Sequence, residues 1–230
     1  MKFLKYILEI LFPVSCVSCG ASINDEKNLF CAKCLTETVF TSYPSVLKNE
    51  MVDRLVSIGG LKAAYAPLYF KKDAPVKNVF YKIKYGNRPD VAQKMAEFAT
   101  EKFMKILPVD LKLDGVCYVP IHKIKLSKRG YNQSAIIAKV VADKLELPLV
   151  HVLERSSNIE TQTHFGRIDR LKNQEGTIVA SKNVIRHKHL LIIDDILTTG
   201  ATIETCYDAL RLSNPDCLIS ILTLAVTDSW

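Results

Sequence analysis

Two adjacent aspartates, Asp194 and Asp195, end an apolar run and precede a short loop of threonines around Gly200. Carboxylates accept hydrogen bonds from vicinal hydroxyls, and the backbone N–H groups that open a helix bind phosphate. A glycine lets the backbone approach a ligand closely, and the threonine hydroxyls can donate hydrogen bonds. The segment 190–206 therefore predicts a sugar-phosphate site. An ordinary turn with solvated aspartates is the alternative, and the spacing does not match a Walker sequence.

Two further segments carry positive charge that could meet a phosphate or diphosphate. One follows a predicted strand end in the same sheet, so it could face the threonine loop, and its arginine suits a two-pronged phosphate contact. The other, 155–175, is polar, has no clear period, and could form a mobile lid. Solvated surface loops are the alternative for both. The residues assigned to the diphosphate or the lid are Lys123, Lys125, Arg129, Arg167 and Arg170.

Four of the seven cysteines form two CxxC pairs, Cys16 with Cys19 and Cys31 with Cys34. Each pair places two thiolates in one turn, and two such turns complete a tetrahedral zinc site. A module of about 40 residues lacks the core to fold alone, so the metal would hold it together. A redox function of CxxC needs a strand and helix context that is missing here. The spacing predicts a structural zinc ribbon.

The elements that position these segments alternate between apolar strands and amphipathic helices. Strands that are apolar on both faces predict an α/β fold with a mainly parallel open sheet. Ligands bind such sheets at the carboxyl ends of the strands, where Asp194 and Asp195 fall. Strands are expected within 59–70, 115–120, 149–153, 176–181, 189–195 and 218–226, and helices at 74–87, 89–106, 202–212 and ending near 147. The expected organisation is a zinc-ribbon module (1–45), a linker (46–60) and an α/β domain (61–230).

Composition limits the class of protein. The chain has 230 residues, 48% of them hydrophobic and 24% charged, which is typical of a globular protein and not of a disordered one. The formal net charge of +7 favours polyanionic partners. No apolar run approaches the roughly 18 residues that a membrane span needs. The first 16 residues read as an amphipathic helix and not as a signal peptide, so a cytoplasmic location is expected.

The segment 190–206 closely resembles the phosphoribosyl diphosphate (PRPP) motif of type I phosphoribosyltransferases. The resemblance implies that Asp194 and Asp195 hold the ribose 2′ and 3′ hydroxyls. It also implies Mg²⁺ chelated by the diphosphate and the ribose oxygens. The 5′-phosphate would be held by Thr198, Thr199, Gly200, Ala201 and Thr202.

The order of the segments resembles the ComF family, which also includes GntX. The matching pieces are the cysteine module, "KIKYGNRPDVAQKMAEF", "RGYNQ" and "DDILTTGAT". One departure is "NQEGTIVA", where that family tends to have an aromatic residue after the glycine. The resemblance implies a part in natural transformation, with DNA-uptake or recombination proteins as partners.

Three functions remain open on the sequence. The first is Mg²⁺-dependent transfer of a phosphoribosyl group, and the second is a ribose-phosphate-binding protein whose ribbon contacts single-stranded DNA. The third is nucleobase salvage, which lacks an identifiable base-recognition segment. Four aromatic residues near the ribbon could stack on bases or could form its core: Phe12, Phe30, Phe40 and Tyr43.

Overall fold

The computed structural model describes residues 14–23, 25, 28–156 and 178–228. Its centre is a parallel sheet in the order β1-β7-β6-β3, with β2 also paired to β7. The two central strands are apolar on both faces, as expected of strands covered by helices on both sides. The bounds are β1 Leu61–Tyr65, β2 Leu68–Phe70, β3 Gly115–Tyr118, β6 His189–Leu197 and β7 Leu218–Thr227. The predicted α/β class with a mainly parallel sheet is confirmed.

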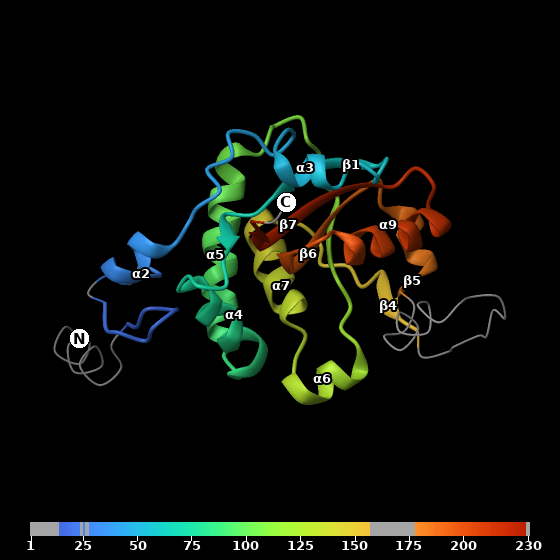
Figure 1. The fold of residues 1–230 in the computed structure, drawn as a ribbon. Coiled ribbons are helices and arrows are strands. Elements are labelled where there is room, and N and C mark those ends of the chain that lie inside the picture. Colours follow the sequence, from blue (N-terminus) through green and yellow to red (C-terminus); the bar gives the residue numbers. More distant parts are fainter. Residues whose placement is uncertain (1–13, 24, 26–27, 157–177, 229–230) are drawn as a thin grey trace, which may run out of the picture.

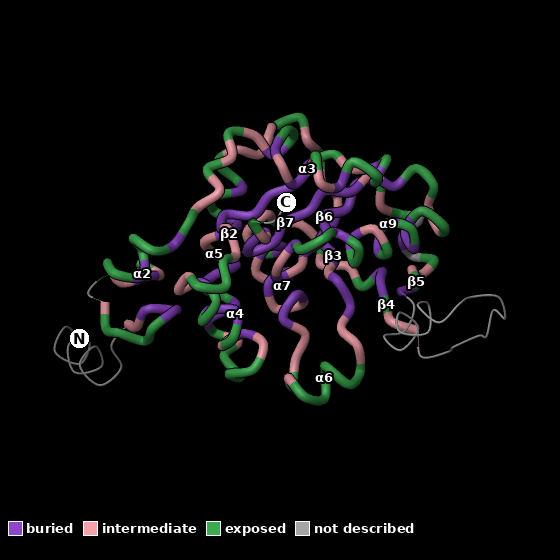
Figure 2. Tube along the Cα trace, viewed as in Figure 1, coloured by how far each residue is buried: buried purple, intermediate pink, exposed green. Residues whose placement is uncertain are grey.

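Helices cover both faces of this sheet (Figure 1). On one face α4 (Val76–Tyr85), α5 (Pro89–Ile106) and α7 (Gln133–Leu145) pack against Leu191 and Ile193 of β6. On the other face α3 (Glu50–Arg54) and α9 (Ala201–Ser213) pack against Leu190 and Ile192. Figure 2 shows the strands as the buried centre of the molecule. The remaining elements are α2 Ala32–Glu37, α6 Lys123–Arg129, the antiparallel pair β4 Leu153–Arg155 and β5 Ile178–Ala180, and the 3₁₀ helix η1 Lys182–Arg186.

Two segments differ from the sequence-based expectation. The basic stretch after β3, expected as a loop, contains the short helix α6. The strand expected at 149–153 does not form as one strand. Leu149 makes an isolated bridge to Val116, and β4 begins only at Leu153. Neither difference alters the sheet order.

The expected linker, 46–60, contains the helix α3. Asn49 starts this helix, because its side-chain oxygen accepts from the backbone N–H groups of Met51 (3.0 Å) and Val52 (3.3 Å). Met51 and Leu55 are fully buried against the sheet. Part of the polar sequence that suggested a linker is therefore the N-terminal cap of α3. The division into domains stays a prediction.

Within the described part of the chain, no helix has both the length and the apolar character that crossing a bilayer requires.

Candidate functional site

The two carboxylates at the carboxyl end of β6 have different partners. Ser134 Oγ, in the first turn of α7, donates to Asp194 Oδ1 at 2.8 Å, and the Asp195 backbone N–H donates to the same oxygen at 2.9 Å. Asp195 is buried, and its Oδ2 forms an ion pair with Lys84 Nζ of α4 at 3.0 Å. That oxygen accepts no well-aligned hydrogen bond from the described residues. Its acceptor capacity is therefore only partly used within the described part of the chain.

Asp194 has an unusual protonation equilibrium for an aspartate. Burial and repulsion from Asp195 raise the pKa of Asp194 to about 7, although the Ser134 hydrogen bond opposes this. Two adjacent carboxylates at the end of a buried strand thus cost folding energy when both are ionised. Such perturbed groups cluster at functional sites.

A stability measurement should detect this cost. Because the folded-state pKa lies above the unfolded value, the folded chain binds the proton more tightly, and stability falls as pH rises from about 4 to about 7. We expect the wild-type protein to lose about 2 kcal/mol of unfolding free energy, relative to Asp194→Asn, between pH 5 and pH 8. Urea denaturation at both pH values measures it. If the unfolding free energies of the two proteins changed equally with pH, the raised pKa of Asp194 would be contradicted.

The loop after β6 turns sharply at Gly200 and opens α9. Gly200 has φ +91°, and a Cβ at this position would lie 2.4 Å from Leu55 Cδ2. The Glu204 N–H donates to the Gly200 carbonyl at 2.9 Å, so the N–H groups of residues 201–203 precede the first helical bond. Four residues of the predicted phosphate loop are exposed around this opening: Thr198, Thr199, Ala201 and Thr202.

Gly200→Ala should therefore damage both the fold and the loop. The left-handed backbone and the contact with Leu55 should lower the unfolding free energy by about 1–2 kcal/mol. Gly59→Ala is the matched control, since its added Cβ would meet only Tyr207 Oη at 3.7 Å. Chemical denaturation of both variants measures the effect, and equal stability would argue against a strained turn.

Arg54 of α3 fastens this loop to the sheet. Its guanidinium donates to the Thr198 carbonyl at 2.9 Å and to the Thr227 carbonyl, at the end of β7, also at 2.9 Å. Ser57 Oγ donates to Glu204 Oε1 in the first turn of α9. The segment expected as a linker therefore braces the predicted phosphate loop.

The "RGYNQ" segment joins four elements near the carboxylates. Gly130 ends α6 with φ +77°, and Tyr131 Oη donates to the Ile83 carbonyl near the end of α4. Asn132 caps α7 by accepting from the Ser134 N–H at 3.0 Å and donates to the Val119 carbonyl at 3.0 Å. The motif thereby brings Ser134 to Asp194.

The residues predicted to hold the diphosphate lie on α6, which stands out from the sheet between β3 and α7 (Figure 1). Lys123 and Lys125 are exposed there. The Arg129 guanidinium lies 5.5 Å from the centre of the Tyr85 ring, in cation–π range. Arg167 and Arg170 fall outside the described residues. Their roles toward a diphosphate stay predictions.

Three residues near the site escaped the sequence analysis: Lys84, Ser134 and Arg54. Lys84 carried one usable signal, because it lies four residues after the buried Phe80, at the border of the apolar face of α4. A lysine in that position is well placed for a buried partner. Arg54 carried no such signal.

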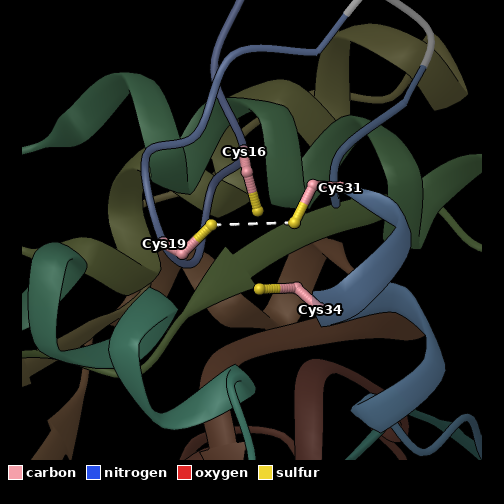
Figure 3. Close-up of side chains that lie close together, drawn as sticks. All are labelled: Cys16, Cys19, Cys31 and Cys34. Carbon is pink, nitrogen blue, oxygen red and sulfur yellow. Dashed lines mark hydrogen bonds between the residues drawn. The ribbon is translucent and has the colours of Figure 1, made fainter.

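The four paired cysteines form one cluster, as predicted (Figure 3). All four Sγ atoms lie within 4.8 Å of one another, and those of Cys19 and Cys31 are 3.7 Å apart. A tetrahedral zinc–thiolate site with bonds of about 2.3 Å has sulfur–sulfur separations of about 3.8 Å. The donor set therefore fits a structural Zn²⁺.

The thiols of this cluster differ in acidity. Burial opposes ionisation of Cys16, but backbone hydrogen bonds from Cys19, Cys31 and Ser18 outweigh it and lower its pKa to about 6. Burial and the neighbouring thiols raise the pKa of Cys34 to about 12. Metal binding would have to displace the proton of Cys34, as expected for thiolate ligands.

The aromatic residues that could stack on bases or form a core pack against the core where the structure describes them. Phe30 is buried, the Phe40 ring packs edge-on against Phe98 at 6.1 Å, and Tyr43 Oη donates to Glu50 at 2.7 Å. Phe12 lies outside the described residues. This packing favours the core alternative for Phe30, and it leaves Phe40 and Tyr43 partly exposed at the edge of the core.

Comparison with known proteins agrees with this geometry. Residues 132–230, which contain "DDILTTGAT", match the family model described as "Phosphoribosyl transferase domain". Over 105 residues the chain is 29% identical to "Competence protein F" of Haemophilus influenzae, covering 44% of this chain and 46% of that protein. It is 25% identical over 164 residues to "Competence protein ComFC" of Bacillus subtilis, covering 71% and 59%. These relatives support the resemblance of the chain to the ComF family.

The chain has a further similar protein that it matches over most of its length. It is 24% identical over 194 residues to "DNA utilization protein YhgH" of Salmonella typhimurium, covering 82% of this chain and 80% of that protein. The chain thus spans about half the length of the Haemophilus relative and most of the Salmonella one.

Two solved structures are similar at low identity. One is an allosteric regulatory enzyme of purine biosynthesis (16% identity, TM-score 0.40), and the other is glutamine PRPP amidotransferase from B. subtilis (16%, TM-score 0.42). They cover 63% and 61% of this chain, which in turn covers 30% of each.

Proposed function

We propose that this protein is a member of the ComF family and binds PRPP or a related ribose phosphate at the carboxyl end of β6. The observation that carries the proposal is the buried Asp195 carboxylate, whose Oδ2 retains acceptor capacity, followed at once by the tight turn at Gly200 and the start of α9. Asp194 and Asp195 would accept the ribose hydroxyls. The loop 198–202 would hold the 5′-phosphate with its N–H groups and hydroxyls.

Positive charge near the carboxylates fits the same ligand. Lys84 lies against Asp195, and Arg155 of β4 donates from Nε to the Pro120 carbonyl at 3.0 Å, just beyond β3. Mg²⁺, held by the diphosphate and the ribose oxygens, would neutralise part of the ligand's charge. With a suitable acceptor, the same arrangement would position the ribose for phosphoribosyl transfer.

Calorimetry with PRPP and Mg²⁺ tests the binding proposal. A saturable heat near one equivalent per chain is the expected result, and no heat at millimolar PRPP would refute it. Diphosphate release with a panel of nucleobases separates transfer from binding. Release with a nucleobase would favour salvage.

We also propose that the protein acts in DNA uptake and contacts single-stranded DNA through a surface on α4 and α6. The names of its relatives refer to competence and DNA utilization. Tyr81 and Tyr85 are 64% and 66% exposed, with ring centres 5.5 Å apart, and Arg129 lies over Tyr85. The two helices contain no acidic residue and seven basic ones: Lys77, Lys82, Lys84, Lys123, Lys125, Lys128 and Arg129. Exposed aromatic rings beside basic residues suit stacked bases and a phosphate backbone.

Replacing both tyrosines by alanine should weaken binding of a labelled oligothymidylate by about tenfold or more, because each ring would lose a stacked base. The slope of log affinity against log salt should stay unchanged, whereas Lys123→Met with Lys125→Met should reduce it. Fluorescence anisotropy across a salt series measures both. Wild-type affinity in the tyrosine variant would refute this surface.

A further inference from the structure

The cysteine cluster contacts α4 through the turn between its first two cysteines. Ser18 Oγ donates to the Pro75 carbonyl, at the start of α4, at 2.7 Å. Lys82 Nζ, near the end of α4, donates to the Val17 carbonyl at 3.1 Å. Val17 and Ser18 are both buried. The turn between Cys16 and Cys19 thus holds α4 at two points.

The same helix reaches the carboxylates two residues later. Lys84 Nζ forms its ion pair with Asp195 Oδ2 at 3.0 Å, and the Ile83 carbonyl accepts from Tyr131 Oη. Residues 82 and 84 are about 200° apart around a helix, so their side chains leave it on opposite sides. Lys82 therefore contacts the cysteine module while Lys84 contacts the sheet.

The position of α4 depends on these anchors. The helix has ten residues, a length at which tertiary contacts supply most of the stability. The anchor residues Val17 and Ser18 lie inside a turn that a bound metal ion would fix, since Cys16 and Cys19 are both donors in the cluster. The ordered turn, which contacts both ends of α4, and the ion pair of Lys84 are therefore parts of one connected set of contacts.

We propose that metal bound to the cysteine cluster sets the ligand affinity of the carboxylate site through α4, with Lys84 as the residue that positions Asp195. Lys84 offsets the repulsion between the two adjacent carboxylates and fixes the position of the Asp195 side chain. The inference rests on the ribose-phosphate site proposed above and adds its regulation. Loss of the metal would free the turn, release α4 and weaken the site.

The first test leaves all four cysteines in place. In Ser18→Ala combined with Lys82→Met, the zinc content should stay at one equivalent while the Kd for PRPP with Mg²⁺ rises about 5- to 100-fold, the range of typical coupling between sites. Lys94→Met, an exposed lysine on α5, is the control and should bind as wild type. Wild-type affinity in the double variant would overturn the proposal.

The second test examines Lys84 itself. Lys84→Met should weaken PRPP binding, and adding the Ser18 and Lys82 substitutions should then have little further effect, because both act through one contact. Lys84→Arg should restore part of the affinity. Fully additive losses would show that the anchors and Lys84 act independently and would contradict the coupling.

A third measurement does not depend on PRPP. Hydrogen exchange of residues 76–85 should accelerate when zinc is removed by a chelator and in the Ser18 and Lys82 double variant, while β6 and β7 stay protected. If the wild-type protein fails to bind PRPP, the proposed function fails, yet this exchange still tests the link. Unchanged exchange in α4 would refute it. Reciprocity further requires PRPP to tighten zinc binding by the same factor, which a chelator titration measures.

Discussion

Replacing Asp194 and Asp195 together by asparagine is expected to abolish PRPP binding while leaving zinc content unchanged. Each ionised carboxylate can accept charge-assisted hydrogen bonds worth about 1.5–3 kcal/mol, so losing both should weaken binding by at least about 100-fold. An asparagine amide also presents an N–H₂ donor to a ligand hydroxyl, whereas the ionised carboxylate offers only acceptors. The cysteine cluster uses other ligand atoms and should retain its metal.

Calorimetry with PRPP and Mg²⁺, together with a zinc assay, measures these two effects. Asp208→Asn is the matched control, because Asp208 is an exposed carboxylate on α9, the helix that the loop opens. The control should bind as wild type. Retained affinity in the double variant would refute the assignment of the ribose site.

Replacing Cys31 by serine is expected to remove the bound zinc and unfold the region from 14 to about 45. The ion's contribution to such small modules is about 10–16 kcal/mol in peptide systems, far more than their own core supplies. The sheet should remain folded, since the cluster of buried residues around β6 and β7 is largely formed by other elements.

Limited proteolysis and a zinc assay measure this loss. Cys217→Ser is the control, because Cys217 is buried, lies outside the cluster, and donates to the Leu218 carbonyl at 3.5 Å, as a hydroxyl can. The control should keep its zinc and its resistance to protease. Full zinc content in the Cys31 variant would contradict a four-thiolate site.

The sheet could be predicted because each strand is indicated by a local run of apolar residues, and such runs recur along the chain. Segments such as "HLLIIDDIL" and "LISILTLAVT" are apolar at successive positions, which only a strand buried on both faces requires. The CxxC spacing likewise fixes two thiols within one turn, so the cluster followed from sequence. In both cases the residues that cooperate are close in the chain.

The unpredicted parts depend on contacts between distant segments. Lys84 and Asp195 are far apart in sequence, and nothing around Arg54 indicates that it will reach the carbonyls of Thr198 and Thr227. The aromatic residues of the ribbon were equally compatible with a surface or a core, and their contacts with Phe98 and Glu50 could not be read from the sequence. Burial and long-range pairing are set by the fold as a whole.

The helix α3 also determines where a truncation could separate the sheet from the cysteine cluster. A fragment starting at residue 61 would lack Arg54, Ser57 and Leu55, and so would lose the brace on the loop 198–202 and a wall of its turn. Asn49 also donates to the Ala64 carbonyl at 2.9 Å, which ties the start of α3 to β1. A minimal ligand-binding fragment should therefore begin before Ser45, whose carbonyl accepts the other Asn49 hydrogen bond. Truncated forms of this protein should therefore begin upstream of α3.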